Sequence, residues 1–176
     1  MTKESIVTVG TQLFRFCGLI ARAFTRTLQL DAEFWDSDRY STEAATRMIR
    51  GNPDLLLYWA RIYMSYALTG MHILTTFRPA NIFELSFEHV ARAMELFAVA
   101  HEYGHHHHDH GRQIDRQAEK AEEFEADQFA LKICYEIERY PDALGHNPYL
   151  TSGAGGLILL RALRTLRTVE TRLNGT

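Results

Sequence analysis

One stretch decides the fold of this chain: VARAMELFAVAHEYGH, residues 90–105. Apolar residues recur in it at three- and four-residue steps, which is the periodicity of an amphipathic α-helix: Val90, Met94, Phe97 and Ala98. His101 and His105 continue the same stripe. We therefore expect a long helix over residues 84–109, with both histidines on the face that turns toward the core.

The two histidines flank a glutamate at a spacing that suits a metal ion. His101 and His105 are one helical turn apart, so both rings can reach the same ion. Glu102 lies beside them, where a carboxylate can take a proton from a metal-activated water instead of binding the metal. This H-E-x-x-H pattern is the signature of zinc peptidases and predicts a hydrolase. At this point the alternative stays open that both are core histidines, hydrogen-bonded to backbone carbonyls.

A catalytic zinc ion has three protein ligands and keeps a fourth position for water, so a further ligand is required. A second helix is expected over residues 116–139, and Glu123 and Asp127 share its otherwise apolar face. Because an ionised carboxylate there is costly to bury unless it is paired or metal-bound, Glu123 is the expected third ligand. Asp127, one turn later, is expected to hold the free ring nitrogen of a ligating histidine. Glu122 and Glu125 project from other faces and are expected to be solvated.

The two segments together, His101-Glu102-x-x-His105 and Glu123-x-x-Ala-Asp127, resemble the gluzincin arrangement H-E-x-x-H…E-x-x-A-[DN]. CAAX-prenyl-protein and heat-shock membrane peptidases share this arrangement with the soluble ImmA/IrrE-like peptidases, and the phage-exclusion Lit-type peptidases are a further neighbour. The resemblance implies a compact, helical, zincin-like domain in which His101, His105 and Glu123 bind one zinc ion per chain and Glu102 is the general base. Asp127 is closer to the membrane group, whereas the short chain is closer to the soluble group.

The histidine run after the motif needs a separate interpretation. Metzincins place a third histidine six residues after the second, but this chain has Gly111 there, so that pattern fails. Gly111 is instead the expected residue just past the helix end. The remaining histidines are expected at the helix end and on the surface: His106, His107, His108 and His110. A second metal site or a pH-sensitive surface remains an alternative.

Peptide hydrolysis also needs a donor for the oxyanion, and zinc peptidases often take it from outside the metal-binding helices. His146 is the candidate donor in the loop His-Asn-Pro-Tyr149, with Tyr149 and Tyr140 as further candidates.

With 176 residues, of which 46% are hydrophobic, the chain is expected to form a single, mainly α domain over residues 1–176. Residues 72–77 have strand-forming character and would supply one short edge strand or hairpin, although a plain helix end is the preferred interpretation. Helices are expected near residues 5–29, 42–50, 54–75, 84–109, 116–139 and 156–173.

Charge and composition limit the location and the partners. A net charge of −3 gives no general reason to expect a nucleic-acid partner. Two distant cysteines, Cys17 and Cys134, are expected to be buried and free, which favours a cytoplasmic location. The most apolar stretch, residues 54–77, is interrupted by Arg61 and His72 and is expected to be a buried helix, not a membrane span.

The first thirty residues have no persuasive secretory signal, because their arginines run through the apolar pattern. They have a net charge of +3, from four basic residues and one acidic residue, so peripheral contact with an anionic membrane or partner stays open.

The sequence therefore predicts a zinc-dependent metalloendopeptidase that acts on a protein or peptide substrate. One alternative is a catalytically silent zinc-binding interaction protein. Against it, a structural site has no use for Glu102 and ordinarily closes its fourth position with another protein ligand. Another alternative is a metal-free helical module whose motif is accidental. The oligomeric state is not predicted.

Overall fold

The computed structural model describes residues 8–28, 41–73, 84–110, 116–139, 149 and 152–175. In these residues the regular structure is entirely α-helical, which confirms the predicted mainly α fold. The helices are α1 (Thr11–Leu28), α3 (Thr42–Arg50), α4 (Pro53–Thr69), α5 (Glu84–His107), α6 (Arg116–Glu138) and α7 (Ser152–Asn174).

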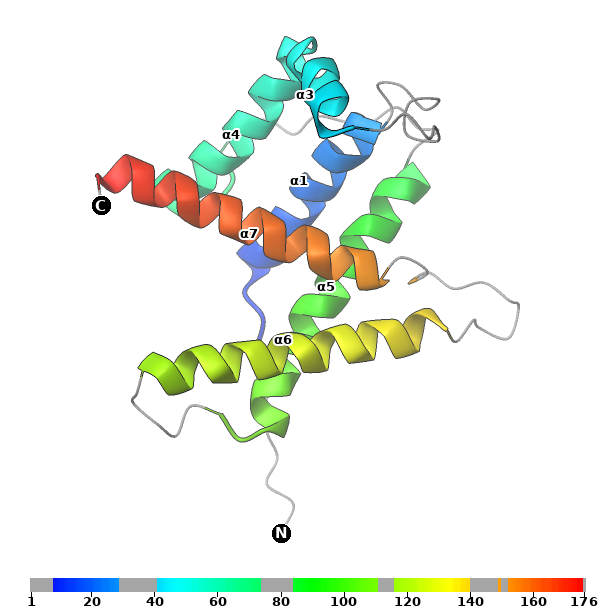
Figure 1. Cartoon of the computed structure of the whole chain (residues 1–176), viewed down its shortest axis with the longest axis vertical. Helices are drawn as coiled ribbons and strands as arrows, with labels where there is room; N and C mark the ends of the chain where they lie inside the picture. The colour runs from blue at the N-terminus through cyan, green and yellow to red at the C-terminus, as the bar shows by residue number, and fades with distance from the viewer. Residues whose placement is uncertain are drawn as a thin grey trace.

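Helix α5 is the centre of the arrangement. It packs against α1, α6 and α7, and Figure 1 shows α6 and α7 each crossing it, with α6 toward its carboxyl end. The predicted stripe faces this packing, since Met94, Phe97 and Ala98 are all buried. Large side chains from three neighbouring elements complete the core: Phe16, Ile20, Ile62 and Leu159.

Helix α4 runs antiparallel to α1, and two side-chain hydrogen bonds join the two helices near their opposite ends. The Tyr66 hydroxyl donates to the carbonyl oxygen of Gln12 at 3.1 Å, near the start of α1. At the other end, the Trp59 indole donates to the Thr27 hydroxyl at 3.2 Å. These bonds set the relative register of the two helices.

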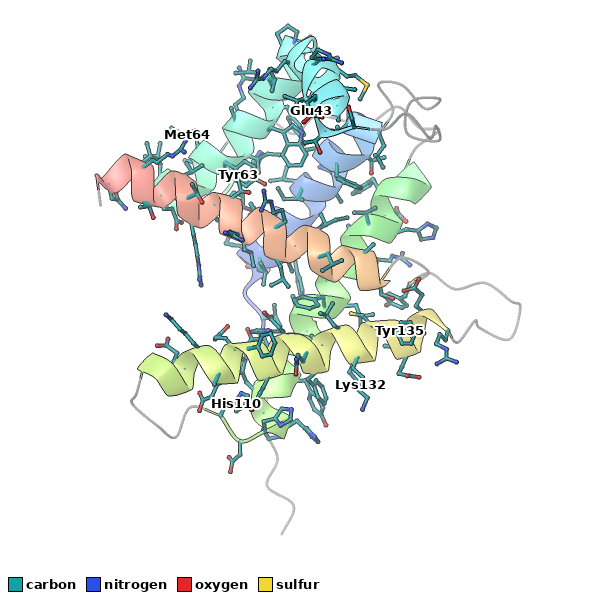
Figure 2. All side chains as sticks on the ribbon, in the orientation of Figure 1. Glu43, Tyr63, Met64, His110, Lys132 and Tyr135 are labelled. Atoms are coloured by element: carbon teal, nitrogen blue, oxygen red, sulfur yellow. The ribbon has the colours of Figure 1, made fainter. Side chains whose placement is uncertain are left out.

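Helix α4 differs from the prediction in length and in burial. It ends at Thr69 and not near residue 75, because Gly70 adopts a left-handed conformation (φ 67°) and its N–H caps the Tyr66 carbonyl. The face of α4 that carries Tyr63 packs against the core, whereas Met64 and Leu68 are exposed. The helix is therefore buried on one face only, as the positions of Tyr63 and Met64 show (Figure 2).

Other predicted boundaries also need correction. The first helix begins at Thr11, since residues 8–10 are not helical, and the last begins at Ser152 and not at residue 156. Of the proposed edge strand, residues 72 and 73 form no strand, and residues 74–77 lie outside the described part of the chain. Among the described helices, none has the length and apolar character to cross a membrane.

The thiols of Cys17 and Cys134 are free and fully buried, as predicted. Burial raises the pKa of Cys17 to about 12 and that of Cys134 to about 11. Both thiols are therefore neutral near pH 7 and behave as small apolar groups in the core.

Helix α7 crosses α5 through glycines. A Cβ atom on Gly155 would lie 2.6 Å from the carbonyl carbon of Ala93 and 2.8 Å from the Met94 nitrogen. On Gly156 it would lie 2.6 Å from Cδ2 of Phe97. Ser152, also buried, donates its hydroxyl to the carbonyl of Cys134 at 3.0 Å, which ties the start of α7 to α6. The glycines thus allow a close backbone approach that places α7 against both α5 and α6.

Gly155→Val is expected to destabilise the protein by about 3 kcal/mol or more, because the new side chain collides with the backbone of α5, which cannot rotate away. Urea unfolding followed by circular dichroism measures the change. The matched control is Gly18→Ala within α1, where a Cβ atom meets nothing within 4 Å. This change should stabilise the protein by at most about 1 kcal/mol, because alanine has the higher helix propensity. Equal unfolding midpoints for wild type and Gly155→Val would contradict this packing.

Candidate metal centre

The two motif helices touch at a pair of small residues. Gly104 on α5 is buried, and a Cβ atom there would lie 3.1 Å from Cα and 3.3 Å from the carbonyl oxygen of Ala126 on α6. The residues that follow this contact directly are His105 and Asp127. The small residues inside each motif therefore let the helices approach closely enough for their polar side chains to meet. This role was not predicted from the sequence.

The structure brings the three predicted ligands together. The Nε2 atoms of His101 and His105 are 3.0 Å apart. The Glu123 carboxylate spans both, with Oε2 at 3.5 Å from His101 Nε2 and Oε1 at 3.5 Å from His105 Nε2. Ligand atoms of a tetrahedral zinc ion, with bonds of about 2.0–2.2 Å, are about 3.3 Å apart. These residues could therefore hold one metal ion with little rearrangement.

The cluster is open to solvent on the α6 side. The histidine side chains of His101 and His105 are only 17% and 25% exposed, whereas Glu123 is 56% exposed. An ion held between them would be fixed from the protein side by imidazole rings and accessible from the side of the carboxylate.

Asp127 lies one turn after Glu123 and contacts the other nitrogen of His101. The distance from His101 Nδ1 to Asp127 Oδ1 is 2.9 Å, and the carboxylate is 28% exposed. Because the carboxylate can only accept, the Nδ1 hydrogen donates to it, and the Nε2 lone pair is left facing His105 and Glu123. Asp127 thus holds His101 in the tautomer that a metal requires.

Asp127→Ala is expected to lower the affinity of the centre for zinc about 10- to 100-fold, since His101 loses the contact that fixes its tautomer and ring orientation. Competition against a zinc-binding dye measures this affinity. Glu119→Ala is the matched control, because it removes an exposed negative charge from the same helix. If both variants lower the affinity for zinc equally, Asp127 acts only through its negative charge and the role assigned to its contact with His101 is wrong.

The end of α5 brings a further histidine to the cluster. Asp109 adopts a left-handed conformation (φ 59°), and its N–H donates to the carbonyl of His106 at 3.2 Å. The N–H of His110 donates to the carbonyl of His105 at 3.0 Å. This pair of bonds is a Schellman motif, with Asp109 in the position that was predicted for Gly111. It turns the chain back over the last helical turn.

As a result His110 is not a surface residue, which corrects the prediction for this position. Its side chain is only 6% exposed and lies below α6, next to the end of α5 (Figure 2). The Nδ1 atoms of His110 and His105 are 3.0 Å apart, and His110 Nε2 is 3.1 Å from Oε2 of Glu125. Glu125, expected to be solvated, is 57% exposed but takes part in this contact. A chain of contacts therefore runs from His105 through His110 to Glu125.

The remaining predicted residues are placed as follows. Glu102 is exposed on α5, directly after His101, and His106, His107 and His108 are exposed as expected. Tyr149 precedes α7, where its carbonyl accepts the N–H of Ser152 at 2.9 Å. The candidate oxyanion donor His146 and its alternative Tyr140 lie outside the described residues.

A scan of the chain against protein-family models gives no match, and searches of curated proteins and of solved structures give none either. In its described part the chain is a helical domain in which two crossing helices present a histidine–histidine–glutamate cluster that could hold a metal ion.

Proposed function

We propose that this chain is a zinc-dependent metallopeptidase of the gluzincin type, which hydrolyses peptide bonds in a protein or peptide substrate. The observation that carries the proposal is the convergence of His101, His105 and Glu123, whose donor atoms are 3.0–3.5 Å apart. Two imidazole nitrogens and one carboxylate oxygen at these distances suit zinc better than calcium or magnesium, which prefer sites made of oxygen ligands.

The number of ligands supports a catalytic role for the metal. A structural zinc site is ordinarily closed by four protein ligands, whereas a catalytic site has three. In the described residues this cluster consists of three groups, and Glu123 leaves it open to solvent. Glu102, which has no place in a structural site, is exposed on the same helix.

The proposed reaction uses the residues of α5 and α6 in separate roles. Zinc, when bound, supplies a Lewis acid that lowers the pKa of water to about 7 and polarises the peptide carbonyl. Glu102 accepts a proton from the water as the water oxygen attacks the carbonyl carbon. Glu102 then donates this proton to the amine nitrogen as the C–N bond breaks. Asp127 keeps His101 oriented throughout, through the contact at 2.9 Å.

A test of this proposal combines metal content with cleavage of a peptide library. Protein purified without chelator is expected to contain about one zinc ion in this centre and to cleave peptides, as followed by mass spectrometry. A chelator should abolish cleavage and added zinc should restore it, while His101→Ala should show neither zinc in this centre nor cleavage. Metal-free protein from such a purification, or cleavage that survives the chelator, would contradict the proposal.

A further inference from the structure

We propose that His108, His110 and Glu125 form a second site for a transition-metal ion, and that filling it opposes filling of the first. One part rests on the proposed function: the opposition requires that a metal ion occupies His101, His105 and Glu123. The existence of the second site does not depend on it.

The second cluster brings together a donor set that can bind a metal ion. His108, His110 and Glu125 each offer a ligand atom within 4.8 Å of the others. The rings of His108 and His110 are stacked, with centroids 5.3 Å apart and planes at 16°. Nδ1 of His110 is taken by His105, so Nε2, at 3.1 Å from Glu125, is the nitrogen left for an ion. Two imidazoles and one carboxylate suit zinc, nickel or copper(II).

The second cluster also has room for an ion with its water ligands. His108 and Glu125 line an open pocket of about 520 Å³, together with His107 and Phe129. Glu125 is 57% exposed and His108 is exposed, so an ion can approach from solvent without movement of the helices. The first cluster uses none of these side chains as a ligand.

The opposition between the sites follows from the hydrogen that His105 and His110 share. When Nε2 of His105 binds a metal, the ring hydrogen is on Nδ1, and it donates to Nδ1 of His110 at 3.0 Å. The neutral ring of His110 then has its own hydrogen on Nε2, from which it donates to Glu125. Each hydrogen in this chain of contacts therefore has an acceptor when the first site alone is filled.

A metal on His110 reverses this arrangement. It takes the lone pair of Nε2, so the one hydrogen of the neutral ring moves from Nε2 to Nδ1, with no net gain or loss of a proton. Two N–H groups would then face each other across 3.0 Å, where one hydrogen bond had been. With both sites filled, a favourable contact is lost and a repulsive one replaces it. The two sites are thus negatively coupled, and by linkage each weakens the other by the same factor.

The test is a zinc titration of metal-free full-length protein by isothermal calorimetry, with four variants. Wild type is expected to bind two zinc ions, whereas His108→Ala binds one in the first site and Glu123→Ala binds one in the second. The second site in Glu123→Ala should bind zinc about tenfold or more tightly than the second step of wild type, because the first site no longer opposes it. His110→Ala, which removes the shared ring, should bind one ion.

His106→Ala is the matched control, since His106 is an exposed histidine of the same run that is not part of either cluster. It should bind two ions with wild-type affinities. If His106→Ala and His108→Ala lose bound zinc equally, the histidine run binds zinc unspecifically and the second site is overturned. Binding of two zinc ions by His108→Ala would also overturn it. Equal second-site affinity in wild type and Glu123→Ala would overturn the opposition. Failure of the first site is distinguishable, because Glu123→Ala would then bind as many ions as wild type.

Discussion

Glu102→Gln is expected to abolish peptide hydrolysis while zinc stays bound. The amide has nearly the shape of the carboxylate but cannot accept a proton, and loss of a general base costs about 10²- to 10⁴-fold in rate. Because Glu102 is exposed and is not one of the clustered ligands, its replacement should leave both the fold and the metal affinity unchanged. The measurement is the rate of peptide cleavage at equal zinc content, with the unfolding midpoint as a check.

Glu88→Gln is the control for this variant, because Glu88 is an acid on the same helix whose side chain is 49% exposed and lies 3.7 Å from Arg92. Its rate should equal that of wild type. If zinc-loaded Glu102→Gln cleaves peptides at the wild-type rate, the general-base role is wrong. If wild type holds zinc but cleaves no peptide in a broad library, the chain is a zinc-binding interaction protein instead.

Glu123→Ala is expected to reduce the zinc affinity of the first site by about 10³-fold. Zinc bound by a complete set of protein ligands gains about 10–16 kcal/mol, so the loss of one ligand corresponds to roughly 3–5 kcal/mol. The Glu123 side chain is 56% exposed, and its removal opens no cavity in the core, so the effect should appear in metal binding and not in folding. Dialysis against a zinc buffer, followed by elemental analysis, measures it.

Glu122→Ala is the comparison that makes this result specific. Glu122 is the neighbouring acid, and it would be the ligand if the register of α6 were shifted by one residue. Its replacement should leave zinc binding within about twofold of wild type. If Glu122→Ala loses zinc and Glu123→Ala keeps it, the assignment of the third ligand is wrong.

Local periodicity was sufficient to predict the helices that form the site. The stripe from Val90 to His105 follows the 3.6-residue period of a helix, and the structure has α5 over Glu84–His107. The second helix, expected over residues 116–139, is α6 over Arg116–Glu138. The sequence also predicted that the ligands meet, because a histidine pair and a carboxylate on an otherwise apolar stripe each lack a partner unless their helices cross. The expected burial of Glu123 was wrong, however, since its side chain is 56% exposed.

Features that depend on helix crossings and chain turns were not predictable in this way. Gly155 contacts α5, which is far from it in the sequence, and nothing in the local sequence pattern indicates which helix Gly155 contacts. The position of His110 depends on the left-handed conformation of Asp109, which is uncommon for any residue other than glycine. The signal in the sequence for this turn was Asp109, which directly precedes His110. Gly111 was expected to end the helix instead, because glycine is the usual residue just past a helix end.

The central claim is that His101, His105 and Glu123 hold one zinc ion with a fourth position left open. A crystal structure with anomalous data collected on both sides of the zinc absorption edge tests it most directly. The expected result is a zinc peak within roughly 2.0–2.2 Å of both Nε2 atoms and of a Glu123 carboxylate oxygen, with no fourth protein ligand. A peak bound only by His108, His110 and Glu125, or a fourth protein ligand on the first ion, would contradict it.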